Sequence, residues 1–379
     1  MRNNIKLTIE NIRSSDNFNY LFNLAKEENF FDDINKLAVP TLNLIKIKNL
    51  IIAKIEKKEK KTKLISKPYR IVVDPTNACN LGCPLCPTGL GASTRTKKIL
   101  KVNDFKKIVD QVQDYCIEIH LYNWGEPTLN KNLIEMLQYA KSKNIWSRIS
   151  SNLSLKFKEG YLEDLLKSGL NLLHVDVDGL DQEVYAKYRR KGNLSVVIGN
   201  LKKIMNIKKT LELEEPKIEI AMLAMRQNEH QHQEFFKFGK ELSVDDTKLH
   251  KIQHNPNMDE KWLPKNTDLI YKTYEGGQAS STSGLDNEIK QCNWPWSGIV
   301  INPDGGVNPC CIIDDPNSDF GNTNSDTISK IWNNQDYISA RSEFGDKKEI
   351  TKNTICNICK NQTHSKRLSR VSKSFAIKL

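Results

Sequence analysis

The feature that most constrains the fold is a regular alternation of short strand-like runs and helical segments through the middle of the chain. Each run is rich in β-branched residues, and the segment that follows it has the periodicity of an amphipathic helix. Strands that alternate with helices in this way pair in parallel, so the pattern predicts βα units in a parallel sheet or barrel. The predicted strands cover residues 69–75, 117–127, 146–154, 171–179 and 216–225.

The positive charge of the chain is concentrated in two flanks. The 379 residues carry a formal net charge of +11, but residues 46–67 hold nine lysines against two glutamates, and residues 360–379 hold six basic residues and no acid. The body between them is close to neutral, which argues against a broad nucleic-acid groove, and we expect no nucleic-acid partner. The flanks suit an anionic partner such as a phosphorylated substrate or a lipid headgroup.

Residues 1–67 are expected to form a separate helical extension. Within it, residues 41–63 place four apolar side chains on one helical face and end in a lysine-rich run; the four are Leu44, Ile47, Ile51 and Ile55. One interpretation is a helix packed on the body with its lysines reaching into solvent. The other is a helix that, together with residues 360–379, contacts an anionic membrane surface.

The sequence predicts a cytoplasmic protein. No stretch reaches the roughly 18 consecutive apolar residues of a membrane span, and the first residues lack the apolar run of a signal peptide. A peripheral position at the inner face of the membrane is the alternative that the basic flanks allow. Thiols stay reduced in the cytoplasm, so clustered cysteines indicate metal ligands or catalytic groups rather than disulfides.

Three of the nine cysteines, Cys79, Cys83 and Cys86, lie in a loop rich in proline and glycine directly after the first predicted strand. Catalytic groups of α/β proteins gather at the carboxyl ends of the strands. Three thiolates can bind three irons of a [4Fe–4S] cube and leave the fourth iron open to a small molecule. Zinc ligands and buried core cysteines are the alternatives, but a structural zinc site would need a fourth ligand nearby.

These residues resemble the cluster motif of radical S-adenosylmethionine (SAM) enzymes. "NWGEP" at 123–127 resembles the family's glycine–glutamate motif, which implies that Glu126, assisted by the backbone at Gly125, contacts the amino group of the cofactor's methionine. "SSN" at 150–152 resembles the turn that contacts the ribose, which implies this role for Ser151 and Asn152.

A further resemblance covers "VDVDGLDQEVYAKYRRKG" at 175–192, which is similar to the fourth-strand segment of the family. It implies that Asp176, together with Arg189 or Arg190, helps to hold the cofactor carboxylate, although Asp176 stands where the family usually has serine. Leu85 occupies the position where the family often has an aromatic residue, and it is expected to cover the adenine.

A second cysteine group, Cys292, Cys310, Cys356 and Cys359, can form a complete cage for another cube. A β-hairpin with a turn at 303–306 would bring Cys292 and Cys310 together, and a Cys-x-x-Cys pair supplies the rest. The segment resembles the SPASM/Twitch domain, which implies one auxiliary [4Fe–4S] cluster, because the further cysteines of a full SPASM pattern are absent. A zinc ribbon is the alternative.

The remaining two cysteines have no assigned ligand role. Cys116 is expected to be a small buried hydrophobic residue. Cys311 adjoins a ligand and is either structural or a hydrogen-atom donor, the latter if the reaction is an epimerisation.

The expected fold class is α/β: a partial TIM-type (β/α)6 barrel with a small C-terminal β-hairpin-plus-helix iron–sulfur domain. The predicted domains are the helical basic extension at 1–67, the barrel at 68–285, and the auxiliary cluster domain with its basic tail at 286–379.

The resemblance implies a radical SAM enzyme of the dehydrogenase or epimerase type. Such an enzyme cleaves SAM to a 5′-deoxyadenosyl radical, abstracts a substrate hydrogen and passes an electron to the auxiliary cluster. The expected substrate is a sugar, a cyclitol or a lipid-linked glycan, and the expected partner is an external one-electron donor such as flavodoxin or ferredoxin. The alternatives are a ribosomal-peptide maturase that forms cross-links or epimers, and a non-enzymatic iron–sulfur electron carrier.

Overall fold

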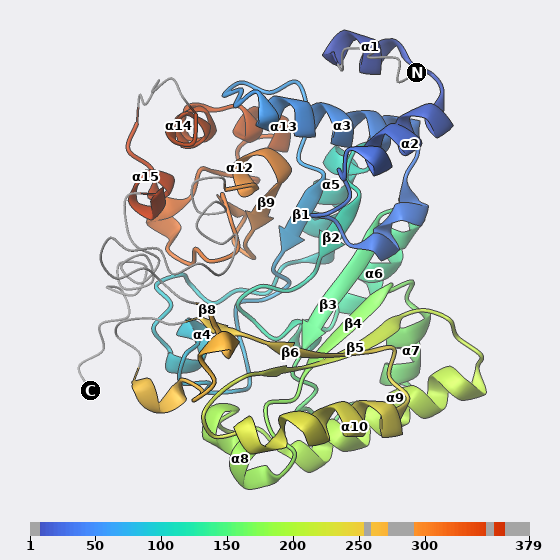
Figure 1. The fold of residues 1–379 in the computed structure, drawn as a ribbon, viewed down its shortest axis with the longest axis vertical. Coiled ribbons are helices and arrows are strands. Elements are labelled where there is room, and N and C mark those ends of the chain that lie inside the picture. The colour runs from blue at the N-terminus through green and yellow to red at the C-terminus, as the bar shows by residue number, and fades with distance from the viewer. Residues whose placement is uncertain (1–7, 254–258, 272–291, 346–351, 361–379) are drawn as a thin grey trace.

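A parallel sheet forms the centre of the molecule (Figure 1). The computed structural model describes residues 8–253, 259–271, 292–345 and 352–360. Within these residues the main sheet has nine strands in the order β11-β10-β9-β1-β2-β3-β4-β5-β6. The strands are β1 (Arg70–Val73), β2 (Glu118–His120), β3 (Trp146–Ser151), β4 (Leu172–Asp176), β5 (Lys217–Leu223), β6 (Asp246–His250), β9 (Gly298–Ile301), β10 (Gly306–Asn308) and β11 (Gly321–Asn322). Strands β7 (Ile252–Gln253) and β8 (Ile270–Tyr271) pair separately.

Neighbouring strands from β1 to β6 are parallel, and helices connect them. This confirms the α/β fold with a partial barrel. The connecting helices are α4 (Pro87–Leu90), α5 (Val102–Val112), α6 (Leu133–Ser142), α7 (Tyr161–Lys167), α8 (Gln182–Tyr188), α9 (Leu194–Thr210) and α10 (His232–Leu242). Short 3₁₀ helices occur at η2 (Pro127–Leu129), η3 (Glu229–Gln231), η4 (Glu260–Trp262), η5 (Thr267–Leu269) and η6 (Pro316–Ser318).

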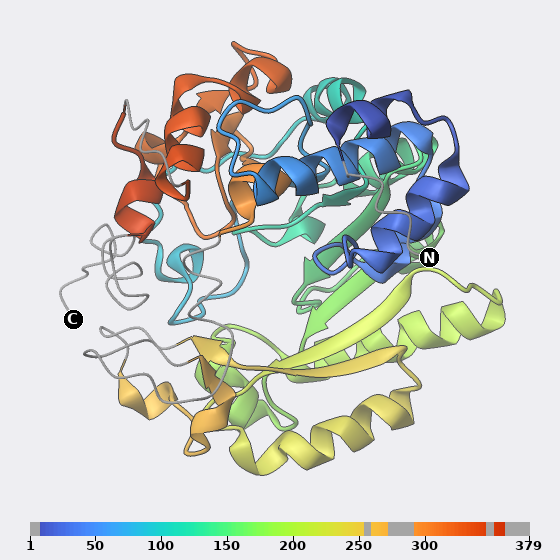
Figure 2. The same ribbon diagram turned by 45° about the horizontal axis from the view of Figure 1, so that its top comes forward.

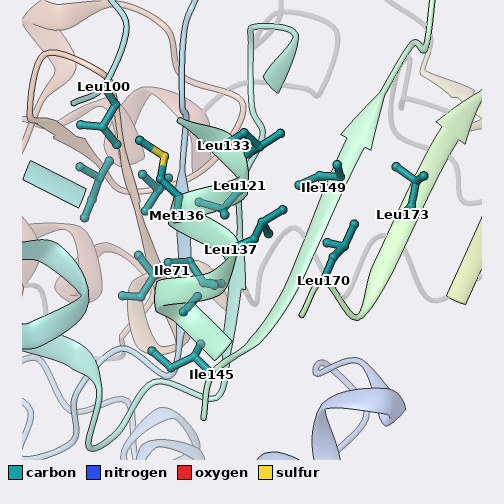
Figure 3. Packing of buried hydrophobic residues seen from close by; sticks show 14 of the residues in the cluster. Ile71, Leu100, Leu121, Leu133, Met136, Leu137, Ile145, Ile149, Leu170 and Leu173 are labelled. Atoms are coloured by element: carbon teal, nitrogen blue, oxygen red, sulfur yellow. The ribbon is translucent and has the colours of Figure 1, made fainter. Parts of the chain in front are cut away.

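Side chains alternate along the strands between a helix-facing side and an inner side. Figure 3 shows the helix-facing side, where Leu133 and Leu137 of α6 lie near Leu121 and Ile149. These residues belong to one buried apolar cluster that runs along the barrel helices. Burial of this side leaves the inner side of the strands available for polar residues.

The five predicted strands are confirmed, but each is shorter than the pattern indicated. The largest difference is at 117–127, where only Glu118–His120 is strand. The chain leaves the sheet there because Gly125 packs against the preceding loop: an added Cβ would lie 1.6 Å from the carbonyl oxygen of Thr76. Strands β6 and β11 were not recognised in the sequence.

The N-terminal extension closes the amino end of the barrel. It consists of α1 (Ile9–Ser14), α2 (Phe18–Glu27), η1 (Lys36–Thr41) and α3 (Leu44–Lys58), drawn in blue along one side of the sheet in Figures 1 and 2. Its apolar side chains share a second buried cluster with residues at or just before the starts of β1 to β4, namely Tyr69, Ile117, Trp146 and Leu172.

The apolar face of α3 is buried in this cluster, so the packed interpretation of residues 41–63 is favoured over the membrane-surface one. Ile47, Ile51 and Ile55 are all buried there. Within the described residues, no helix is long and apolar enough to cross a membrane. Membrane contact by the basic tail stays a prediction, because residues 361–379 lie outside the described part of the chain.

The C-terminal segment extends the barrel sheet instead of standing apart from it. After α12 (Trp294–Ser297), strand β9 pairs in parallel with β1, and β10 returns antiparallel to β9. This confirms the predicted hairpin, whose turn contains Gly305 at a φ of 86°. Helices α13 (Ile328–Trp332), α14 (Gln335–Glu343) and α15 (Ile355–Lys360) follow. The domain boundary proposed between 67 and 68 precedes β1, and the one between 285 and 286 lies outside the described residues.

Arg341 links the N-terminal extension to the C-terminal segment through hydrogen bonds to backbone carbonyls. Its guanidinium donates from Nε to the Pro295 carbonyl (2.7 Å), from Nη1 to Thr62 (2.9 Å) and from Nη2 to Trp332 (2.7 Å). Burial lowers the pKa of Arg341 to about 9, and the carbonyl oxygens satisfy its donors. Trp296 adds a hydrogen bond from Nε1 to the Lys61 carbonyl (2.9 Å).

Helix α3 provides a matched pair of substitutions that tests its packing. Ile51 is 0% exposed and Ile45 is 57% exposed. Ile51→Ala should lower the free energy of unfolding by about 2–5 kcal/mol, because it leaves a cavity between the extension and the barrel. Ile45→Ala should change it by no more than about 0.5 kcal/mol. Urea unfolding of the two variants measures both values, and equal small effects would contradict the packed arrangement.

Candidate functional site

The loop after β1 brings Cys79, Cys83 and Cys86 together at the carboxyl end of the strand. None of the three forms a disulfide. Leu81 and Cys83 pack in an apolar cluster with Tyr188, Met225 and Trp262, and Cys79, Leu85 and Cys86 lie against it. Leu85 is half-buried beside the cysteines, which is compatible with the covering role that the sequence indicated.

The electrostatics of the loop suit a positively charged group. Burial, with a smaller contribution from the neighbouring thiols, raises the pKa of Cys79 to about 11 and that of Cys83 to about 12. A buried thiolate therefore needs a compensating cation, and iron supplies one. The residues present fit a cube bound through three thiolates.

No group of three or more His, Cys, Asp or Glu side chains in the described part of the chain is placed to hold a single metal ion. In an iron–sulfur cube each cysteine binds a different iron. Residues 229–232, which include two histidines, form the 3₁₀ helix η3 and the first residue of α10.

Glu126 is the centre of a hydrogen-bond network at the ends of β2 and β3. It is 2% exposed. Its Oε1 accepts from the Thr128 hydroxyl (2.6 Å), the Thr128 amide (3.1 Å) and the Ser151 hydroxyl (2.8 Å), and its Oε2 accepts from the Asn152 amide (2.8 Å). Burial raises the pKa of Glu126 and these donors oppose the rise. Oε2, with one bond, retains capacity for a further donor.

Ser151 and Asn152 lie between Glu126 and the cysteine loop. The Asn152 side chain donates to Asn80 Oδ1 (3.0 Å), and its Nδ2 lies 3.9 Å from the Cys79 sulfur. The Glu126 amide donates to the Ala78 carbonyl (2.8 Å). The structure therefore brings the three sequence motifs into contact at one edge of the sheet.

Arg189 and Arg190, which the sequence left as alternatives, have different surroundings. The Arg189 guanidinium pairs with Asp178 (2.5 Å) and Asp176 (3.4 Å), and its charge acts on the thiols of Cys79 and Cys83. Arg190 is exposed, and its carbonyl accepts from the Gly82 amide (2.9 Å). Arg189 is therefore the arginine at the site, and it offsets the negative charge of Asp176.

The sequence interpretation missed a band of ionisable side chains along the inner side of the strands. We call this band the inner wall; its members are Arg70, Glu118, His120, Arg148, His174, Asp176, Glu219 and Lys248. They occupy the positions that alternate with the helix-facing residues of β1 to β6. The signal was present as polar residues at every second position of the strands, such as those in "HVDVD" at 174–178.

His174 lies between two carboxylates of the inner wall. Its Nδ1 lies 2.6 Å from Glu219 and its Nε2 lies 3.2 Å from Asp176. Burial alone would lower the pKa of His174, but the two carboxylates outweigh it and raise the pKa to about 9. His174 is therefore positively charged at neutral pH and holds Asp176 in position beside Arg189.

Arg148 has fewer partners. Its Nη2 lies 4.0 Å from Glu219, a carboxylate already bonded to His174 and Lys248. Its Nε is buried without a hydrogen-bond partner within the described structure. Arg148 also lies over the Tyr122 ring, 5.4 Å from the centroid.

The four cysteines of the second group, Cys292, Cys310, Cys356 and Cys359, also lie near one another. Burial raises the pKa of Cys310 well above its usual value, and nearby Cys292, Cys356 and Cys359 raise it further. Cys356 and Cys359 lie one turn apart on α15. This helix is tied to α14 by a hydrogen bond from Asn357 to Glu343 (2.6 Å).

The other two cysteines have contrasting positions. Cys116 is fully buried in the barrel core, as expected. Burial raises the pKa of Cys311, and the charge of Arg70 opposes the rise. Burial also raises the pKa of Tyr122, with Cys311 and Asp176 among the charges that raise it further. Cys311 therefore lies near the inner wall, next to Cys310.

Comparison with known proteins identifies both segments. Residues 73–238 match the family model of the radical SAM superfamily, and residues 292–360 match the model of the SPASM iron–sulfur cluster-binding domain. The GTP 3′,8-cyclase of Desulforamulus reducens is 27% identical over 175 residues, which are 45% of this chain and 52% of that protein. The chain thus spans about half the length of that relative.

Other relatives align with this chain over a larger share of their length. The PqqA peptide cyclase of Bradyrhizobium diazoefficiens is 22% identical over 325 residues, 79% of this chain and 81% of that protein. Among solved structures, Streptococcus suis SuiB bound to S-adenosylmethionine has a TM-score of 0.58 and 17% identity, and covers 84% of this chain and 76% of its own. At this identity the likeness shows the fold.

The two family models match in the order in which the two cysteine groups occur along the chain. The first model spans the loop with Cys79, and the second spans all four cysteines of the second group. The chain is therefore a member of the radical SAM superfamily with a C-terminal SPASM iron–sulfur domain.

Proposed function

We propose that this enzyme is an oxidoreductase in which the substrate lies against the inner wall and loses an electron to the auxiliary cluster. The observation that supports this proposal is the position of the wall. At one end Asp176 pairs with Arg189, beside Cys83. At the other end Arg70 lies near Cys311, next to Cys310.

In this proposal Cys79, Cys83 and Cys86 hold the SAM-binding [4Fe–4S] cluster. Cys292, Cys310, Cys356 and Cys359 hold the auxiliary cluster. Gly125, Glu126, Ser151, Asn152 and Leu85 contact SAM, and Arg189, steadied by Asp176, meets its carboxylate. When bound, the cluster and SAM supply a 5′-deoxyadenosyl radical that removes a hydrogen atom from the substrate. An external one-electron donor such as flavodoxin or ferredoxin is required to reduce the cluster.

The proposed substrate is a sugar, a cyclitol or a lipid-linked glycan. The inner wall supports this proposal, because closely spaced ionised groups favour hydroxyls and anionic groups over apolar surfaces. Arg148, with its unpartnered Nε, is suited to an anionic group of the substrate.

A peptide substrate is the second candidate. It is favoured by the relative with broad coverage, the PqqA peptide cyclase. Incubation of the enzyme with short peptides encoded beside its gene distinguishes the two candidates. Faster release of 5′-deoxyadenosine with such a peptide than with glycans would favour the peptide reaction.

The metal content gives the first test of the cysteine assignment. Protein reconstituted without oxygen should contain about eight irons per chain, and the triple variant Cys79→Ala/Cys83→Ala/Cys86→Ala should retain about four. Cys116→Ala is the control and should retain about eight, since this side chain lies in the barrel core. Iron and sulfide assays measure the result, and zinc in place of iron in the native protein would contradict it.

Glu126→Gln tests the proposed contact with SAM. The substitution should weaken SAM binding about 10- to 150-fold, which corresponds to loss of one charge-assisted hydrogen bond. Both clusters should still assemble. Glu135→Gln on the exposed face of α6 is the matched control and should leave affinity unchanged. Calorimetry measures the affinities, and an unaltered value for Glu126→Gln would place the contact elsewhere.

The auxiliary cluster can be removed separately to test electron acceptance. Cys356→Ala/Cys359→Ala should still release 5′-deoxyadenosine with dithionite, because the first cysteine group is intact. Oxidised product should fall much further than 5′-deoxyadenosine does, since the substrate radical cannot pass on its electron. Chromatography quantifies both products. Full yield of oxidised product from a folded double variant would rule out this role.

Epimerisation with Cys311 as hydrogen donor predicts a different result. Product formed by the native enzyme in heavy water would carry deuterium at the inverted carbon, and Cys311→Ala would stop turnover after hydrogen abstraction. Mass spectrometry of the product distinguishes the two reactions.

A further inference from the structure

We propose that Arg148, deep on the inner wall, binds a carboxylate of the substrate, so that the substrate is a sugar acid of the uronate class. This proposal rests on the proposed function, and it narrows the substrate from glycans in general to those that carry a carboxylate. It is drawn from the pairing of charges on the wall, which leaves Arg148 without a counter-ion of its own among the described residues.

Every cation of the inner wall other than Arg148 pairs with a carboxylate, and so does neighbouring Arg189. The four pairs are Arg70 with Glu118, His174 with Asp176, Lys248 with Glu219, and Arg189 with Asp178. His120 adds no charge at neutral pH, because burial lowers its pKa. Within the described residues this pairing uses every carboxylate of the wall, so the charge of Arg148 is left over.

Glu219 approaches Arg148 without neutralising it. Arg148 Nη2 lies 4.0 Å from Glu219 Oε1, which is beyond hydrogen-bond distance. Oε1 already contacts His174 Nδ1 (2.6 Å), and Oε2 accepts from Lys248. Arg148 Nε is buried without a hydrogen-bond partner in the described part of the chain. A guanidinium that lacks acceptors in such a position favours the binding of an anion that supplies them.

Aromatic stacking holds the Arg148 guanidinium in place. Its Cζ lies 5.4 Å from the centroid of the Tyr122 ring, which stacks on the His120 ring at 5.8 Å and 8°. An aromatic ring against one face of a guanidinium leaves the N–H groups in its plane available to a ligand. The Arg148 side chain is 20% exposed, so a small ligand inside the barrel can reach it.

The depth of Arg148 selects a terminal group of the substrate. On β3, Arg148 lies three residues before Ser151, a rise of about 10 Å along the strand. Trp146, at the start of β3, belongs to the buried cluster that the N-terminal extension forms at the amino end of the barrel. The barrel is therefore closed below Arg148, and an anion bound there enters first, from the end where SAM is expected. The carboxylate of a uronate is such a terminal group.

A carboxylate fits Arg148 better than a phosphate does. The wall has one uncompensated positive charge, whereas a phosphate monoester carries about −1.5 to −2 charges at pH 7. The additional negative charge would lie near Glu219 without a cation to balance it. A carboxylate carries one charge, and its two coplanar oxygens match the planar N–H fork of arginine.

Calorimetry with D-glucuronate and D-glucose tests the proposal in the reconstituted full-length enzyme, with SAM present and no reductant. D-Glucuronate should bind about tenfold more tightly than D-glucose or better, because only the acid supplies an anionic acceptor to Arg148. Arg148→Gln should abolish this preference and leave the affinity for D-glucose unchanged. Arg148→Lys keeps the charge without the planar fork and should retain part of the preference.

A control variant and thermal unfolding separate ligand binding from a structural role. Arg13→Gln removes the same charge from an exposed position on α1 and should leave the preference for D-glucuronate intact. Without ligand, Arg148→Gln should melt close to the native temperature, because the charge that it removes has no counter-ion. Saturating D-glucuronate should raise the melting temperature of the native enzyme and not that of Arg148→Gln.

Three results would overturn the proposal. The first is a native enzyme that shows no preference for D-glucuronate over D-glucose. The second is Arg148-dependent binding of glucose 6-phosphate that is tighter than that of D-glucuronate, which would make this a phosphate subsite. The third is tighter Arg148-dependent binding of the amide of N-acetyl-L-glutamate, which would assign the subsite to an acidic peptide side chain.

The outcome is separable from that of the proposed function. If the preference for D-glucuronate depends on Arg148 and no oxidised product forms, the subsite stands and the oxidoreductase assignment fails. If D-glucuronate is not preferred and a neutral glycan is oxidised, the subsite assignment fails and the proposed function stands.

Discussion

The parallel pairing of β9 with β1 is the contact on which the arrangement of both cysteine groups depends. Its register sets Arg70 beside Gly298 and Val73 beside Ile301. The loop with Cys79 leaves from the end of β1, whereas β10 runs back along β9 and delivers Cys310 toward the level where β1 begins. The two groups are therefore separated by the length of a strand, and the inner wall occupies the space between them.

The parts of the structure that could be predicted from the sequence are those encoded over short distances along the chain. The loop with Cys79, Cys83 and Cys86 carries its ligands within eight positions, and the Cys-x-x-Cys pair lies on one helical turn. Strands β1 to β5 of the barrel were recognised because each one alternates with a helix. The hairpin was recognised from its turn residues at 303–306.

The parts that could not be predicted depend on pairs of residues far apart in the sequence. Nothing in "NWGEP" shows that Glu126 accepts from both Ser151 and Asn152, and nothing near Arg341 shows that it binds the carbonyl of Thr62. The sequence alone could not decide whether Arg189 or Arg190 lies at the site. The backbone conformation at the end of α8 determines that the Arg189 side chain pairs with Asp178. The same holds for His174 and Glu219, which come from different strands.

The position of β9 also has a consequence for the order in which the chain can fold during synthesis. Strand β1 emerges from the ribosome early, and the strand that covers its outer edge is made only after the whole barrel. Until then that edge exposes unpaired backbone groups to other chains. Pairings between such distant segments form slowly, because a long loop must close first. The nascent protein therefore passes through a stage in which the barrel is complete but the edge of β1 is still unpaired. A chaperone that shields this unpaired edge would raise the yield of native enzyme.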